Sequence, residues 1–408
     1  GKSIFLSMLR AYYDISQKEK FQKRFGDLWI GSRPTPLQGA FQILFLDFSR
    51  IAGIDGTLAQ HFDDYCCGGL DDFASIYEPY YYPGFALEMK QLEGSTNKLN
   101  FLDRKARNNA SRLYLIIDEY DNFTNVVLNE QGNEVYHALT HASGFYREIF
   151  KKYKGMFERI FMTGVSPVTL DDLTSGFNIG TNYSLTQEFN QMMGFTEEEV
   201  REMLTYYSTT SPFNHTVDEL IEIMKPWYDN YCFAQECYGE TTMYNSNMVL
   251  YFVKNYVLYG KVPRDMIEDN IRIDYEKLRM LIRKDKEFSH DASIIQTLVS
   301  QGYIAGELKR GFPAVSIVDP DNFISLLYYF GMLTVSGTHE GKTKLTIPNQ
   351  VVREQLYTYL LNTYNEADLN FSNYERSELS SALAYRGEWL VYFDYIADCL
   401  KRYASQRD

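Results

Sequence analysis

The sequence is short of cysteine, of long apolar runs and of positive charge, and each shortage excludes a class of protein. The 5 cysteines are odd in number and lack the paired spacing of a zinc site, so we expect reduced thiols without a disulfide framework or a cysteine-bound metal. No apolar run approaches the roughly 18 residues that cross a bilayer, and the first residues lack a signal-peptide profile. We therefore expect a cytoplasmic protein with no membrane partner.

Acidic residues outnumber basic ones, and the formal net charge of -14 argues against a general binder of phosphate backbones. A local basic patch is compatible with this balance, so the composition leaves nucleic-acid binding undecided. The 408 residues, 45% hydrophobic and 23% charged, are typical of a globular protein with two or three domains.

The chain begins with Gly1, Lys2 and Ser3, which run straight into an apolar segment with helical spacing. These residues match the last three positions of the P-loop pattern G-x-x-x-x-G-K-[ST], in which the lysine contacts the β- and γ-phosphates and the hydroxyl binds Mg²⁺. Less than half of the pattern is present. Taken alone, so short a match favours coincidence or the remnant of an expression tag.

A second motif supports the first one. The apolar run 113–117 ends in Asp118 and Glu119, which predicts a central parallel strand whose carboxyl end meets a ligand. In this Walker B pattern, Asp118 would hold Mg²⁺ and Glu119 would polarise the attacking water as general base. A buried strand followed by a solvated acidic turn explains the run alone equally well. Together with Gly-Lys-Ser, the run favours a nucleotide site.

Another apolar strand, 159–163, ends at Thr163, and Ser166 follows it. In ATPases with a catalytic glutamate, the strand after Walker B lies beside it and carries a sensor for the γ-phosphate. Thr163 is the first candidate for that sensor and Ser166 the second. An ordinary strand end followed by a Ser-Pro turn is the alternative for either residue.

Apolar strands are also predicted at 41–49 and 182–186, and a connecting helix at 133–152. This alternation predicts an α/β P-loop NTPase of the ASCE type, with a parallel sheet and helices on both faces. The expected domains are an NTPase domain at 1–190 with a mainly helical insertion at about 53–107, a helical lid at 191–290, a winged-helix-like domain at 291–365 and a helical linker at 366–408. We expect the tyrosines of the insertion to pack a lid against the sheet, with adenine stacking as the alternative: Tyr77, Tyr80, Tyr81 and Tyr82.

The winged-helix-like region is predicted from helices at 293–299 and 321–330, strands at 332–335 and 344–348 around a turn at 336–341, and a helix at 351–364. Segment 321–330 would be the helix that enters a DNA groove. It contains no lysine or arginine and is strongly apolar, so we expect it to be buried.

Three strings in the sequence resemble the AAA-ATPase-like family of bacterial P-loop NTPases: residues 1–9, 115–123 and 163–179. Segments 194–200 and 227–231 extend the resemblance, although Asn230 stands where the family usually has glycine. The resemblance implies ATP and Mg²⁺ as cofactors, a complete P-loop upstream, and a PD-(D/E)XK nuclease-like domain downstream. This sequence would then be a fragment trimmed at both ends, with the nuclease-like domain as its attached partner.

The sequence therefore predicts an ATPase that couples hydrolysis to a conformational change. A nucleotide-sensing or interaction module with little or no hydrolysis is the alternative, and a winged-helix DNA-binding regulator is a weaker one. Arg147 and Arg159 lie in the region where a transition-state arginine is expected, but nothing in the sequence distinguishes either from a surface charge. Assembly into a homo-oligomer also stays open.

Overall fold

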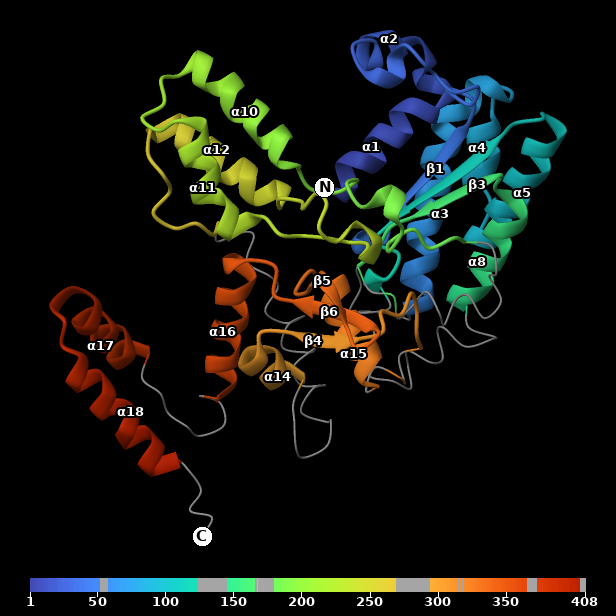
Figure 1. The fold of residues 1–408 in the computed structure, drawn as a ribbon. Helices are drawn as coiled ribbons and strands as arrows, with labels where there is room; N and C mark the ends of the chain where they lie inside the picture. The colour runs from blue at the N-terminus through green and yellow to red at the C-terminus, as the bar shows by residue number, and fades with distance from the viewer. Residues whose placement is uncertain are drawn as a thin grey trace.

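The computed structural model describes residues 1–51, 58–123, 145–165, 167, 180–268, 294–313, 316, 319–364 and 373–403. Two three-stranded sheets organise these residues. The first has the strand order β1-β2-β3 and the second the order β4-β6-β5. Figure 1 shows the first sheet near the N-terminus, the second sheet in the orange part of the chain, and a group of helices between them in sequence.

The first sheet consists of β1 (Gln42–Asp47), β2 (Leu113–Asp118) and β3 (Arg159–Met162). Both pairings are parallel, and β2 lies in the centre of the three strands. All six residues of β2 are buried, which explains why its sequence is a continuous apolar run rather than an alternating one. The predicted strands at 41–49, 113–117 and 159–163 are confirmed, as is the place of the third beside the second.

Helices cover both faces of this sheet, as predicted. α1 (Lys2–Tyr13) packs through Leu6 on the face that carries Ile43 and Ile116. On the opposite face, alternate residues such as Leu44 and Leu115 belong to a larger core. That core is formed with α3 (Leu58–Tyr77), α5 (Ser95–Asn108) and α8 (Phe145–Met156). The arrangement is compatible with an α/β domain of the P-loop type.

Shorter helices complete this part of the chain: η1 (Ile15–Lys20), α2 (Phe21–Phe25), η2 (Trp29–Gly31), η3 (Phe48–Arg50), η4 (Glu78–Tyr80) and α4 (Phe85–Lys90). The predicted insertion between β1 and β2 is therefore helical where it is described. The hydroxyl of Tyr77 accepts the N–H of Ile43 at 2.9 Å, and the hydroxyl of Tyr81 donates to Gln42 Oε1 at 2.6 Å. These two tyrosines pack against the amino end of β1, away from the carboxyl ends of the strands, so they do not stack on a ligand there.

The strand predicted at 182–186 is wrong, and the helix predicted at 133–152 is described only in part. Residues 182–186 form no strand, because the Asn182 side chain accepts the N–H of Ser184 and the N–H of Thr186 bonds to Tyr183, which makes a turn. Of the helix predicted at 133–152, the part before residue 145 lies outside the described residues.

The middle of the chain is helical, with α10 (Glu197–Thr210), α11 (Val217–Tyr228) and α12 (Ser246–Tyr259) around a core of their own. Capping boxes at Thr196 and Thr216 start the first two helices. The helical character predicted for 191–290 is present in these three helices, while their action as a lid stays a prediction. Two short helices flank them, η5 (Gln187–Phe189) and η6 (Gln235–Cys237). Residues 269–290 of the predicted lid lie outside the described residues.

The second sheet is antiparallel and lies among α14 (Ile294–Gln301), α15 (Pro320–Tyr329) and α16 (Gln350–Tyr364). Its strands are β4 (Ile304–Gly306), β5 (Thr334–His339) and β6 (Lys342–Thr346). The predicted order of helices and hairpin is present, but β4 was not predicted. The hairpin turn is also shorter than predicted, because Glu340 and Gly341 both adopt positive φ, of 51° and 80°, and close it in two residues.

Burial of α15 is confirmed, since every residue from Asn322 to Tyr328 is buried. This helix is therefore not free to enter a DNA groove. Assignment of the whole unit as a winged-helix domain stays a prediction.

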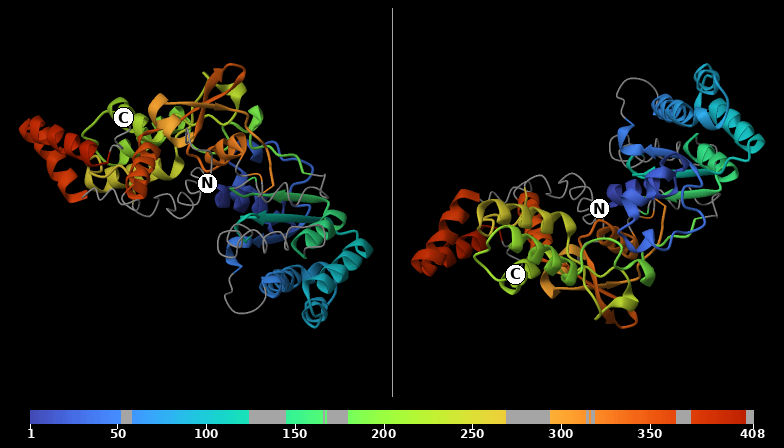
Figure 2. Two further views of the ribbon diagram at one scale, coloured as in Figure 1. Left: turned by 90° about the horizontal axis from the view of Figure 1, so that it is seen from below. Right: turned by 90° about the horizontal axis from the view of Figure 1, so that it is seen from above.

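The last described elements are α17 (Asn373–Arg386) and α18 (Trp389–Tyr403), which pack on each other as a helical hairpin. Figures 1 and 2 show this hairpin at the far side of the molecule from the first sheet. The helical character predicted for 366–408 is confirmed over these two helices, and its role as a linker stays a prediction. Within the described ranges, no helix is long and apolar enough to span a membrane.

Candidate functional site

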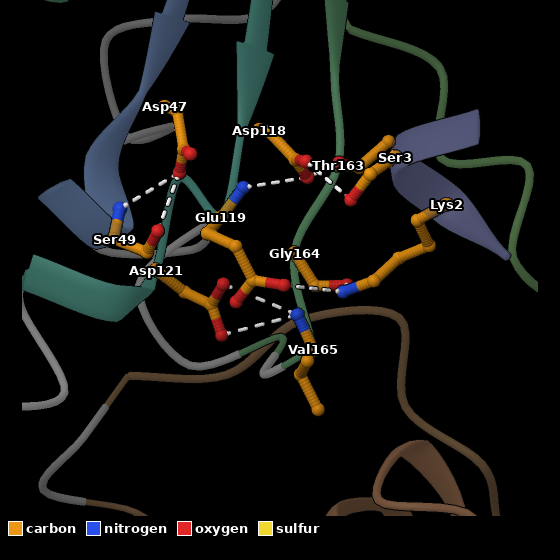
Figure 3. A network of polar contacts seen from close by, with 10 residues as sticks. All are labelled: Lys2, Ser3, Asp47, Ser49, Asp118, Glu119, Asp121, Thr163, Gly164 and Val165. Carbon is orange, nitrogen blue, oxygen red and sulfur yellow. Dashed lines mark hydrogen bonds and ion pairs between the residues drawn. The ribbon is translucent and has the colours of Figure 1, made fainter. Parts of the chain in front are cut away.

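The predicted chemical groups meet where the carboxyl ends of β2 and β3 face the first turn of α1 (Figure 3). Parallel strands end at the same edge of a sheet, so residues that follow β2 and β3 become neighbours although they are 45 positions apart in the sequence. α1 packs across that sheet through Leu6, which places its first residues at the same edge.

Asp118, the last residue of β2, is the centre of the hydrogen-bond network. Its side chain is buried, and Oδ2 accepts the hydroxyl of Ser3 at 3.1 Å. The other oxygen, Oδ1, accepts the hydroxyl of Thr163 at 2.6 Å and the backbone N–H of Glu119 at 3.0 Å. A carboxylate held from three sides has little rotational freedom. With the hydroxyl of Ser3 it forms a pair of hard oxygen donors, the kind that Mg²⁺ prefers.

Lys2 and Glu119 form an ion pair in which Lys2 Nζ lies 3.0 Å from Glu119 Oε1. Both side chains are partly exposed, at 32% and 26%. The same ammonium also donates to the carbonyl oxygen of Gly164 at 3.4 Å. In this conformation the charge of Lys2 is directed at Glu119, so an anionic ligand would compete with the carboxylate for the ammonium.

The backbone of Glu119 is in the left-handed region, with φ of 51°. Few residues other than glycine, asparagine and aspartate adopt this conformation, because their Cβ crowds the backbone. Strained residues of this kind cluster at functional sites. Figure 3 shows the consequence, since the side chain of Glu119 projects from the turn toward Lys2.

The start of α1 adds an electric field that favours the binding of an anion. No side chain caps the helix at Gly1, and its first turn contains no acidic residue. The first N–H groups of a helix have no partner within the helix, and they carry the positive end of its dipole. An anion such as a phosphate is therefore favoured beside Gly1, Lys2 and Ser3.

The structure thus brings together Lys2, Ser3, Asp118, Glu119 and Thr163, with Gly1 at the adjacent helix start. Ser166, the second sensor candidate, lies outside the described residues, as does the side chain of Arg147. Arg159 is exposed and is the first residue of β3, so it lies at the opposite end of the strand from Thr163. It is therefore not within reach of the site in this chain.

Reasoning from the sequence missed three contributors, Asp121, Gly164 and Val165. Both carboxylate oxygens of Asp121 accept the N–H of Val165, at 3.1 and 3.2 Å. The signal for Asp121 was a third acidic residue in the turn after Asp118 and Glu119. No local pattern identifies its partner, because the two residues are 44 positions apart.

Comparison with known proteins agrees with this geometry. Residues 1–174 match the AAA-ATPase-like family model, described as a predicted AAA-ATPase. This part of the chain contains all the residues brought together at the site and is similar to that family, as its motifs suggest. None of the curated proteins matches the chain.

Proposed function

We propose that this protein binds ATP with Mg²⁺ at the first turn of α1, hydrolyses it, and couples hydrolysis to a conformational change. The observation that carries the proposal is the convergence of Lys2 and Ser3 on Glu119 and Asp118, across 117 and 115 positions of sequence. A lysine and a hydroxyl at a helix start, opposite two carboxylates at a strand end, are the groups that P-loop ATPases use.

Ser3 and Asp118 would hold Mg²⁺, since their oxygens are already directed at each other. When bound, the ion neutralises charge on the phosphates. Lys2 would leave Glu119 and place its ammonium on the β- and γ-phosphates, next to the N–H groups of the first turn of α1. Glu119, released from Lys2, would accept a proton from the attacking water. Thr163 would stay beside Asp118 and face the γ-phosphate.

The Lys2–Glu119 ion pair also favours a second candidate, a nucleotide-sensing module with little or no hydrolysis. Both groups needed for turnover are engaged with each other in this structure. ATP binding without catalysis would only require Lys2 to change partner. A DNA-binding regulator receives no support, because the helix expected to enter a groove is buried.

The wider architecture belongs to the same proposal. The resemblance to the AAA-ATPase-like family supports a helical lid at 191–290, a winged-helix-like unit at 291–365 and an attached nuclease-like domain. A cytoplasmic location and a neighbouring protomer that supplies the transition-state arginine are compatible with this proposal.

ATP turnover by the wild type, Glu119→Gln and Lys2→Ala tests the function. We expect Glu119→Gln to lower kcat by about 10²–10⁴-fold while ATP binding persists, because only the general base is lost. Lys2→Ala should weaken ATP binding as well as turnover. Glu307 and Lys309 form an ion pair of similar length, 2.8 Å, in another part of the chain. Glu307→Gln and Lys309→Ala are therefore matched controls and should keep the wild-type kcat.

Equal background turnover by the wild type and both site variants would show that these residues do not catalyse hydrolysis. ATP binding to the wild type that is lost in Lys2→Ala, without turnover in any variant, would support the sensing module instead.

A further inference from the structure

Asp121 lies in the turn that follows β2, three positions after Asp118, and its side chain is only 1% exposed. Both of its carboxylate oxygens accept the backbone N–H of Val165. Val165 follows β3 and is in the loop that contains Thr163. Asp121 therefore connects the turn after the central strand to the loop after its neighbour (Figure 3).

The N–H of Val165 and the carbonyl of Gly164 belong to the same peptide unit. A peptide unit is planar, and its N–H and C=O point in opposite directions. When Asp121 holds the N–H on one side, the carbonyl oxygen is directed to the other side. Lys2 Nζ lies there, 3.4 Å from that oxygen. One rigid peptide thus lies between a buried carboxylate and the lysine of the phosphate-binding turn.

The loop has further connections to β2 and to the turn that follows it. The N–H of Thr163 donates to the carbonyl of Ile117 at 2.9 Å, and the N–H of Tyr120 donates to the carbonyl of Thr163 at 3.0 Å. These bonds fix the start of the loop, where the hydroxyl of Thr163 reaches Asp118. Asp121 fixes the loop two residues later.

Gly164 permits this close approach. A Cβ at position 164 would lie 2.4 Å from Asp121 Oδ1 and 2.5 Å from Tyr120 Cε1, distances that no side chain tolerates. Glycine is therefore required here by packing against Asp121 and Tyr120.

We propose that Asp121 is a positioning residue for the nucleotide site: it orients the Gly164–Val165 peptide so that the carbonyl faces Lys2 and Thr163 stays on Asp118. This inference rests on the proposed ATPase function and adds a residue to it. Asp121 acts through the peptide and does not itself touch Lys2 or Asp118 by any described hydrogen bond. Loss of its acceptor would free the loop to shift, and displacements of about 1 Å can cost about 10²-fold in rate.

Three variants and one control test the role of Asp121. Asp121→Ala removes the acceptor, Asp121→Asn keeps one acceptor oxygen without the charge, and Gly164→Ala displaces the same peptide from its other side. Asp321 is the matched control, because its carboxylate accepts the N–H of Glu307 at 3.0 Å and a Cβ on the preceding Gly306 would meet it at 3.1 Å. Asp321→Ala therefore removes a similar carboxylate–peptide bond far from the site in sequence.

Steady-state ATP hydrolysis is the first measurement. We expect Asp121→Ala and Gly164→Ala to lower kcat about 100-fold, Asp121→Asn about fivefold, and Asp321→Ala not at all, with KM for ATP within about threefold throughout. Wild-type kcat in Asp121→Ala or in Gly164→Ala would overturn the proposal. So would a loss in Asp121→Asn as large as in Asp121→Ala, since the charge and not the acceptor would then matter, or an equal loss in Asp321→Ala.

Amide hydrogen exchange of Val165, measured by NMR, is the second measurement and does not depend on hydrolysis. The Val165 N–H should exchange slowly in the wild type, in Asp121→Asn and in Asp321→Ala, and at least about tenfold faster in Asp121→Ala and Gly164→Ala. If the wild type lacks ATPase activity, the function fails but this exchange pattern still tests the position of the peptide. If Asp121→Ala does not fold, both measurements are made on Gly164→Ala. Slow exchange of the Val165 N–H in that variant would overturn the proposal.

Discussion

Replacing Thr163 by valine removes the hydroxyl that donates to Asp118 and keeps the shape of the side chain. The bond that is lost is 2.6 Å long and ends on a buried carboxylate. Hydrogen bonds to charged groups contribute about 1.5–3 kcal/mol, so we expect Thr163→Val to lower the free energy of unfolding by about 2 kcal/mol. Asp118 keeps its bonds to Ser3 and to the N–H of Glu119, so the fold should survive.

The effect on catalysis should exceed what this loss of stability explains. If the same bond holds Asp118 and Thr163 in place during hydrolysis, its loss of about 2 kcal/mol corresponds to a reduction in kcat of about 30-fold. The assay is steady-state ATP hydrolysis at saturating Mg²⁺ and ATP, combined with urea unfolding of the same samples. Thr334→Val is the control, because the buried hydroxyl of Thr334 donates to the carbonyl of Asn230 at 2.8 Å in a different part of the chain.

Thr334→Val should lose similar stability and keep the wild-type kcat. If Thr163→Val is destabilised but turns over ATP at the wild-type rate, Thr163 only supports the structure. If both variants lose kcat in parallel, the reduction reflects general unfolding and says nothing of a sensor.

Three further predictions concern other parts of the chain. Lys98 Nζ lies 2.5 Å from Asp71 and the Lys98 side chain is only 4% exposed, so Asp71→Ala should lower the free energy of unfolding in urea by about 3 kcal/mol. Asp103→Ala, which breaks an exposed ion pair, should lower it by less than about 1 kcal/mol, and equal losses in the two variants would contradict this prediction. Asn230 has φ of 77°, so Asn230→Ala should lower the free energy of unfolding by about 1 kcal/mol in the same assay, and Asn230→Gly should leave it unchanged. An alanine variant as stable as the wild type would argue against backbone strain at this position. Burial raises the pKa of the Cys66 thiol to about 12, so this thiol should resist iodoacetamide at pH 8 until the protein is unfolded. Mass spectrometry measures the alkylation, and rapid modification of Cys66 in the native protein would refute this prediction.

Much of the candidate site was predictable because its signals are local. The apolar run before Asp118 and Glu119 marks a buried strand and its end within a few residues, and Lys2 and Ser3 stand at the start of an apolar helical pattern. Such patterns follow from the geometry of single strands and helices. The strand arrangement of ATPases with a catalytic glutamate then predicted that the end of the next strand, with Thr163, would lie beside Asp118.

Other features depended on partners far away in the sequence. The segment 182–186 has the composition of a strand, but its asparagine forms a turn and no neighbouring strand pairs with it among the described residues. Strand β4 was missed for the opposite reason. Its three residues are too few for a periodic pattern, and pairing with β6 makes them a strand. Arg159 lies in the expected region of sequence, but the direction of β3 carries it to the far end of the sheet.

By itself, the sequence determined the three buried strands of the first sheet, where their polar ends begin, and the resemblance of residues 1–174 to the AAA-ATPase-like family. Only the tertiary structure decided how those ends meet: the Lys2–Glu119 ion pair, the three hydrogen bonds on Asp118, and the peptide that Asp121 holds against Lys2. The reason is physical. Burial and periodicity can be recognised within a few consecutive residues. A hydrogen bond across 44 or 115 positions exists only once the strands have paired and α1 has packed on them.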